Sequence, residues 1–370
     1  MVRKRRILFG LFAFSVLSFS APLGAQNSDI LSPQRALIVE NLVTVCTTML
    51  RSLSPRTKKL SAEDLIAQVR SYRARNPVID FRTRQFLADN KVYLSLTTSP
   101  HRIQHVLPLI KAINLTHIEK IIVNLPDVFG RDGGVYDIPE ALERHPKVLI
   151  HRFGEDLGPA SKIIPSLELA EEQKWRGIVI SIDDDIAYPT ALIHELIMAS
   201  AWRPESVIGG SGQNATFWGL NSEMQEQFVS TRSSRVVEIP DGRLIPVDIL
   251  EGFGAIAYPI GKLNTSLVRE WVDLSIFARV SDDLVLSSAM SLQNLPRYRI
   301  GSDYFRLSHI RPLPYGMGPD ALHRGAGLNG SAPLLRNLID SNRGKYQRAA
   351  DQIAEELRSR LDAEDSPASR

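Results

Sequence analysis

Three consecutive aspartates stand at the end of an apolar run, and they are the residues best suited to do chemistry. The run at 177–182 leads directly into Asp183, Asp184 and Asp185. Unpaired carboxylates are expensive to bury, so these three must face solvent, a cation or a basic partner. Oxygen ligands suit hard cations such as Mn²⁺ or Mg²⁺, and a metal held there would neutralise a diphosphate. A turn with solvated acids is the plainer alternative.

The spacing within this triplet assigns different partners to its members. Successive side chains of an extended chain point to opposite sides. Asp183 and Asp185 are therefore expected to share one side and to bind the metal. Asp184 is left for the nucleotide or for the turn.

Two further glycine-containing segments could contact a ligand. Lys162 follows Gly158-Pro159 at the start of a predicted helix, where its ammonium can reach a phosphate or an acid. An ordinary capped helix explains the same residues equally well. Gly252 and Gly254 flank an aromatic residue in an apolar run and permit close approach of the backbone to a ligand. A β-bulge is the equally good alternative there.

Two more pairs of candidate site residues lie later in the chain. Asp282 and Asp283 precede an apolar helical pattern, and one of them can accept a proton from an acceptor hydroxyl. Taken alone, a helix cap is the simpler explanation for this pair. His323 and Arg324 lie in a glycine-rich stretch, where the imidazole can bind a metal and the guanidinium a phosphate.

The elements that must position these residues alternate along the chain from residue 91. Short apolar runs predict strands, and the segments between them predict helices. The strands are expected at 92–96, 120–124, 147–151 and 177–182, and the helices at 102–113, 139–144, 159–173 and 191–202. Strands interrupted by glycines at 247–258 and a helix at 283–293 follow. This alternation predicts an α/β fold, with a mainly parallel sheet and helices on both faces. Ligands of such sheets bind beyond the carboxyl ends of the strands.

The N-terminus predicts export. Basic residues at 3–6 precede an apolar stretch at 7–19, and small residues follow up to Ala25. This is the pattern of a signal peptide, or of an uncleaved anchor that would associate the chain with a membrane. Either alternative leaves the rest of the chain secreted, periplasmic or lumenal.

Composition and charge limit the remaining possibilities. The 370 residues suffice for one large domain with attachments, and a formal net charge of +3 gives no reason to expect a nucleic-acid partner. The single cysteine, Cys46, excludes an intramolecular disulfide. We expect a signal or anchor at 1–25, a helical extension at 26–90, one main domain at 91–330 and a helical tail at 331–370.

Taken in order, the segments of residues 91–330 resemble a GT-A glycosyltransferase, which has a Rossmann-like α/β fold. Residues 92–100 resemble the first strand and its nucleotide-contacting loop, and the triplet at 183–185 resembles the D-x-D motif. The pair at 282–283 resembles the acids that supply the base in inverting members, and His323 lies where many members have a metal-binding histidine. The resemblance implies nucleotide or phosphate contacts from a further set of residues: Thr97, Ser99, Arg102, Lys162, Asp184, Gly252 and Arg324.

This resemblance implies transfer of a sugar from a nucleotide-sugar donor to a hydroxyl of a glycan, lipid or protein, with Mn²⁺ or Mg²⁺ bound. Two alternatives stay open. The same acids on an α/β sheet suit a metal-dependent phosphohydrolase. A non-catalytic glycan-binding protein can also retain such a fold.

Overall fold

The computed structural model describes residues 61, 79–214, 235–240, 242–273, 279, 282–302 and 307–317, all within the unit Leu60–Arg370. Several predictions lie outside the described residues: the segment at 1–25, Cys46, most of 26–90, His323, Arg324 and the tail at 331–370. Within the described ranges, no helix is long and apolar enough to cross a membrane.

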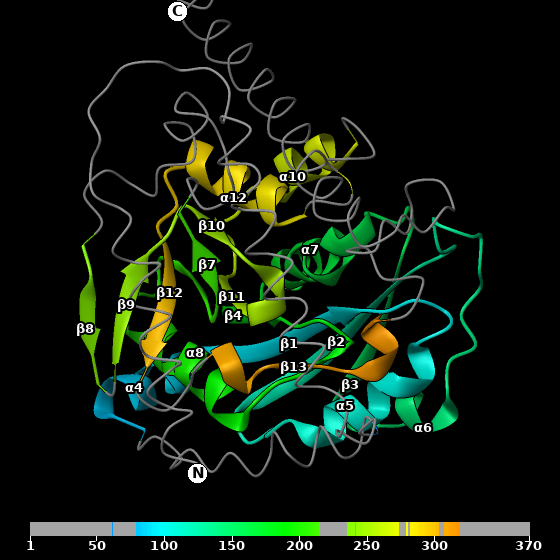
Figure 1. Ribbon diagram of the computed structural model, residues 1–370, viewed down its shortest axis with the longest axis horizontal. Coiled ribbons are helices and arrows are strands. Elements are labelled where there is room, and N and C mark those ends of the chain that lie inside the picture. The colour runs from blue at the N-terminus through cyan, green and yellow to red at the C-terminus, as the bar shows by residue number, and fades with distance from the viewer. Residues whose placement is uncertain are drawn as a thin grey trace, which may run out of the picture. The chain divides into compact units, whose positions relative to one another are not determined.

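A nine-stranded sheet forms the centre of the described structure, in the order β3-β2-β1-β4-β11-β6-β12-β9-β8 (Figure 1). Its strands are β1 (Lys91–Thr97), β2 (Ile118–Pro126), β3 (Val148–Phe153), β4 (Gly177–Ser181), β6 (Val207–Gly209), β8 (Val237–Ile239), β9 (Gly242–Pro246), β11 (Ile256–Pro259) and β12 (Arg297–Ser302). Two short pairs accompany it: β7 (Gly212–Gln213) with β10 (Ile249–Leu250), and β5 (Ile186–Ala187) with β13 (Arg311–Pro312).

The strand directions confirm a mainly parallel sheet. Strands β1 to β4 pair in parallel, as do β6 and β12. Among the strands of the large sheet, β11 and β9 run against the others. The antiparallel β11 matters for function, because it starts where its neighbour β4 ends.

Helices cover both faces of the sheet, as predicted for an α/β fold (Figure 1). One face carries α7 (Ile164–Glu172), α10 (Thr265–Val272) and α12 (Asp282–Leu292). The other carries α4 (Phe81–Asp89), α5 (Val106–Ala112), α6 (Glu140–Glu143) and α8 (Thr190–Trp202).

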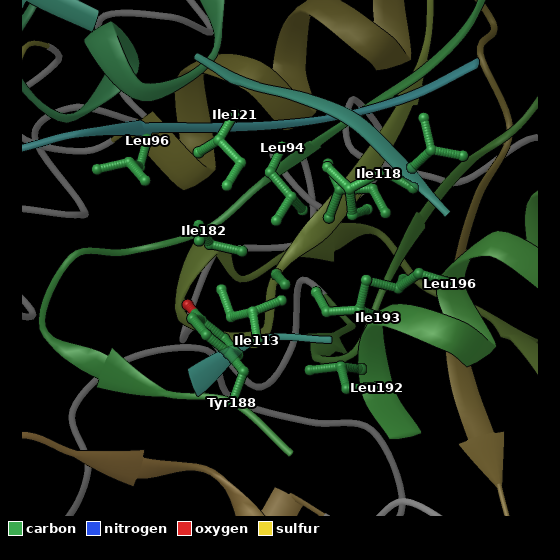
Figure 2. Close-up of a cluster of buried hydrophobic side chains, with 14 of the residues drawn as sticks. Leu94, Leu96, Ile113, Ile118, Ile121, Ile182, Tyr188, Leu192, Ile193 and Leu196 are labelled. Atoms are coloured by element: carbon green, nitrogen blue, oxygen red, sulfur yellow. The ribbon is translucent and has the colours of Figure 1, made fainter. Parts of the chain in front are cut away.

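Side-chain alternation along the central strands builds the two cores. In β1, Tyr93 belongs to the core under α7, α10 and α12, whereas Leu94 belongs to the opposite core. Figure 2 shows that opposite core, where strand residues such as Leu94 and Ile121 lie with Leu192 and Leu196 of α8. Because both faces are buried, the central strands are apolar over most of their length, which made them visible in the sequence.

The predicted helix at 159–173 is divided in the structure. Gly158–Lys162 is a 3₁₀ helix, and α7 begins only at Ile164. The backbone of Ile163 leaves helical geometry, with φ −132° and ψ −43°. Pro165, which lies in the first turn of α7, has no N–H to continue a helical ladder into the preceding turn. The break leaves Lys162 at the end of its own short element.

A substitution at Gly177, the first residue of β4, tests how closely β4 approaches β1. Its φ is +124°, and a Cβ there would lie 1.9 Å from the carbonyl oxygen of Lys91. Gly177→Ala is expected to lower the free energy of unfolding by about 3 kcal/mol, from backbone strain and overpacking together. Urea denaturation measures this loss. Gly261→Ala is the control, because Gly261 has φ +76° but nothing within 4 Å of its Cβ position. Equal losses in the two variants would contradict the steric explanation.

Candidate functional site

The sheet brings the acidic residues together at the carboxyl ends of β1 and β4. Asp183 to Asp185 follow β4, and the loop after β1 carries Thr98 and Arg102. Register between β11 and β4 pairs Ile256 with Ser181. The glycine-rich turn just before β11 therefore lies beside the end of β4.

Lys162 lies at the centre of one half of the site. Its buried ammonium is 2.8 Å from Asp183 Oδ1 and 3.0 Å from Asp282 Oδ2. The neighbouring Asp283 accepts a hydrogen bond from the N–H of Gly252 at 2.8 Å. Four segments that the sequence analysis identified separately thus meet in one place.

Arg102 organises the other half. Its guanidinium contacts Asp184 at 3.2 Å and Asp185 at 2.9 Å. Thr98 donates a hydrogen bond from Oγ1 to the second oxygen of Asp184 at 2.5 Å. Asp184 is almost fully buried, at 4% exposure, and its contacts with Arg102 and Thr98 compensate its carboxylate.

The predicted alternation within the triplet is wrong. Asp183 faces Lys162, whereas Asp184 and Asp185 share Arg102. The reason is local: β4 ends at Ser181, and the chain turns at residues 184–185 before it enters β5. Side-chain alternation holds only for an extended chain, so it does not extend through this turn.

The segment 311–317 packs on the triplet and was not identified from the sequence. The N–H of Leu313 donates to the carbonyl oxygen of Asp185 at 2.7 Å, and the Tyr315 hydroxyl donates to that of Asp184 at 3.2 Å. The Tyr315 ring stacks on His105, with centroids 4.2 Å apart. Nothing local to this segment predicts such contacts, because its partners are more than 100 residues away.

A buried polar network holds the element that carries Lys162. Ser95 donates from its hydroxyl to the carbonyl oxygen of Lys162. The amide nitrogen of Asn124 donates to Ser95 at 3.0 Å and to Ser166 at 2.8 Å. His151 lies 3.0 Å from the amide oxygen of Asn124. A sequence signal existed, because Ser95 and Asn124 interrupt otherwise apolar strands, but the sequence analysis missed it.

The residues predicted to contact a nucleotide differ in their surroundings. Thr97 donates to the backbone carbonyl of Asn124 at 2.9 Å and so links β1 to β2. Ser99 is 3% exposed, and its hydroxyl has no hydrogen-bond partner among the described residues. Gly252 has no room for a side chain, because a Cβ would lie 2.4 Å from Lys162 Nζ.

The site holds more negative charge than its cations neutralise. Five carboxylates from two segments meet two cationic side chains within the described structure: Asp183, Asp184, Asp185, Asp282 and Asp283, with Lys162 and Arg102. Burial, followed by the charges of Asp184 and Asp183, raises the pKa of Asp185 to about 7. Burial and the charge of Asp282 raise the pKa of Asp283 to about 8. Burial alone would lower the pKa of Lys162, but the acids outweigh it and raise that pKa well above its ordinary value. The site therefore favours uptake of a further positive charge.

The raised carboxyl pKa values predict that the stability of the folded chain falls as pH rises. A carboxyl whose pKa is higher in the folded chain binds more protons there, so its contribution to stability falls as pH rises. For Asp185 the fall extends from its ordinary pKa of 3.8 up to about 7. We expect the melting temperature of the metal-free protein to decline between about pH 4 and pH 7.

Thermal unfolding in the presence of a chelator measures this decline. Asp185→Asn should flatten it, because an amide does not ionise. An equally steep decline in that variant would show that other groups cause it.

A divalent cation suits this surplus of negative charge. Mg²⁺ in phosphate-transferring sites is commonly held by one or two carboxylates, with phosphate oxygens and water as the remaining ligands. Asp183 and Asp185 are each partly exposed, at 24% and 23% of the side chain, so both remain accessible to a cation. No three histidine, cysteine, aspartate or glutamate side chains of the described ranges form a ready metal site. The residues thus fit a metal that shares its coordination sphere with a ligand's phosphates.

Comparison with known proteins identifies no family for the chain. No family model matches it, and no curated protein does. One similar solved structure is a 4-diphosphocytidyl-2C-methyl-D-erythritol synthase, at 12% identity and TM-score 0.30, covering 59% of this chain and 93% of the synthase. Another is a mannosyltransferase from Pyrobaculum calidifontis in complex with GDP-Man and Mn²⁺, at 12% identity and TM-score 0.29, covering 83% of this chain and 89% of that one. Structural similarity at TM-scores this low supports no conclusion about the fold or the reaction. The function must therefore be inferred from the site itself.

Proposed function

We propose that the protein is a metal-dependent glycosyltransferase that moves a sugar from a nucleotide-sugar to a hydroxyl acceptor. One observation carries this proposal: the acidic triplet after β4 meets Lys162 and the acidic pair of α12 at the carboxyl end of the sheet. Glycosyl transfer needs a cationic environment for a departing diphosphate and a base for the acceptor. The residues around the triplet would provide the cationic environment, and the acidic pair of α12 would provide the base.

The cationic environment comes from the residues around the triplet. Asp183 and Asp185 would hold Mn²⁺ or Mg²⁺, which would neutralise charge on the diphosphate as the sugar leaves it. Lys162 has three N–H donors and donates a hydrogen bond to Asp183 at 2.8 Å, while Asp282 lies 3.0 Å away as an ion-pair partner, so donor capacity remains for a phosphate oxygen. Ser99, with its buried hydroxyl, is a further donor for the nucleotide.

Asp283 is the better candidate for the base of an inverting transfer. Its pKa of about 8 lies near the working pH, where a general base is most effective. The Gly252 N–H orients one of its oxygens, and Asp282 is instead paired with Lys162. In this reaction the acceptor oxygen bonds to the anomeric carbon and gives its proton to Asp283. The bond from that carbon to the phosphate oxygen breaks, and the diphosphate departs with the electron pair.

Binding measurements on the full chain test the proposal. A calorimetric titration with a panel of nucleotide-sugars and nucleoside diphosphates should find one that binds with Mn²⁺ present and is lost on chelation. Slow release of free sugar from that donor would support transfer chemistry. Failure of every nucleotide to bind would overturn the proposal. Hydrolysis of para-nitrophenyl phosphate without sugar transfer would favour a phosphohydrolase. Sugar binding that survives chelation, without turnover, would favour a glycan-binding protein.

A further inference from the structure

The turn that contacts Asp283 exposes an aromatic side chain to solvent. Gly252–Gly254 forms a 3₁₀ turn between β10 and β11. Both glycines are buried, whereas Phe253 between them is 40% exposed. A single exposed aromatic is ordinary on a protein surface, so its position needs independent support.

Close packing on both sides fixes this turn. A Cβ on Gly252 would lie 2.4 Å from Lys162 Nζ, and one on Gly254 would lie 2.5 Å from the backbone nitrogen of Ser211. Hydrogen bonds of 3.0 Å from Gly254 N–H to the Glu251 carbonyl and from Ala255 N–H to the Gly252 carbonyl close the turn. The backbone therefore presents Phe253 from a closely packed turn, in which a side chain at position 254 would collide with the backbone of Ser211.

The turn also links Phe253 to the candidate base. The Gly252 N–H that donates to Asp283 belongs to the residue directly before Phe253, and adjacent Cα atoms lie about 3.8 Å apart. A group that gives its proton to Asp283 must lie beside that carboxylate. The exposed aromatic thus follows directly on the residue that contacts the candidate base.

We propose that Phe253 is the stacking platform for the acceptor, and that the acceptor hydroxyl belongs to a pyranose sugar. The face of a pyranose that carries its axial C–H groups is apolar, and its weakly positive hydrogens complement the negative face of an aromatic ring. A sugar stacked there would direct a hydroxyl toward Asp283. The assignment rests on the proposed function, because Asp283 defines which side of the site is the acceptor side.

Saturation-transfer NMR on the full chain tests this platform. The probes are methyl pyranosides of the gluco, galacto, manno and N-acetylglucosamine series, with Mn²⁺ replaced by diamagnetic Mg²⁺. At least one should bind, and Phe253→Ala should weaken its affinity by about tenfold or more. Phe253→Tyr and Phe253→Trp should retain binding, whereas Phe253→Leu should lose it. Phe81→Ala is the control, since Phe81 on α4 is 71% exposed and lies on the other face of the sheet.

Separate outcomes distinguish this inference from the proposed function. If no methyl pyranoside binds, or if Phe253→Ala and Phe253→Leu bind as the unaltered chain does, the platform is refuted. A calorimetric titration of the same variants with nucleoside diphosphates provides the second measurement. Nucleotide affinity should be unchanged in Phe253→Ala. If sugars bind through Phe253 but no nucleotide binds, the platform stands and the transferase proposal fails.

Discussion

Replacement of Asp185 by alanine is expected to reduce kcat/KM by about a thousandfold while leaving the chain folded. Asp185 is one of two carboxylates proposed to hold the metal, and its side chain pairs with Arg102 at 2.9 Å. Without it, Arg102 keeps its ion pair with Asp184, and the proposed metal would lose one of its two carboxylate ligands.

The stability expected for Asp185→Ala distinguishes a loss of catalysis from a loss of the folded state. Burial holds the pKa of Asp185 at about 7, so the ionised carboxylate is disfavoured in the folded chain at neutral pH. Its removal should therefore leave the melting temperature of the metal-free protein unchanged or slightly higher at about pH 8. The stabilisation that we expect Mn²⁺ and nucleotide to give the unaltered protein should be absent in this variant.

Steady-state rates of donor turnover and thermal shifts with Mn²⁺ measure the two effects. Asp89→Ala is the control, because it removes one carboxylate from an exposed position at the end of α4. Metal-dependent nucleotide binding that persists undiminished in Asp185→Ala would refute the assigned metal ligand.

Replacement of Lys162 by methionine is expected to produce the largest loss of stability at the site. The buried ammonium offsets Asp183 and Asp282 directly, and Asp283 also contributes to its raised pKa. Removing one partner of a buried ion pair leaves uncompensated charge and costs about 3 to 5 kcal/mol. Domains are usually stable by about 5 to 15 kcal/mol, so the variant should still fold at low temperature.

The loss of stability in Lys162→Met should decrease as pH falls. Without the ammonium, the pKa of Asp283 rises further, because Lys162 is the charge that lowers it, so protonation relieves more of the repulsion as pH falls. The destabilisation should therefore be smaller at about pH 5 than at about pH 8.

Urea denaturation at both pH values measures this difference. Lys91→Met is the control: Lys91 is an exposed residue, 4.0 Å from Glu119, and its loss should change stability by less than about 1 kcal/mol. Equal stabilities of Lys162→Met and the unaltered chain would show that the acids do not depend on Lys162.

The sequence by itself determined the α/β class and nearly every element around the site. Buried parallel strands such as β1 and β4 are mostly apolar, so local patterns were sufficient to find them. The same patterns singled out the acids after β4, because carboxylates rarely follow a buried strand without a partner. Glycine spacing likewise identified the turn at 252–254.

Tertiary structure alone decided which of these residues belong together. Lys162 and Asp282 are 120 positions apart, and only the antiparallel β11 beside β4 and the packing of α12 bring the four segments into contact. A turn after Ser181 reversed the expected pairing within the triplet, because side-chain alternation ends where the strand ends. The contacts of Tyr315 with the triplet had no local signal at all. Local patterns record how a residue is buried, whereas its partners depend on which strand ends the sheet places side by side.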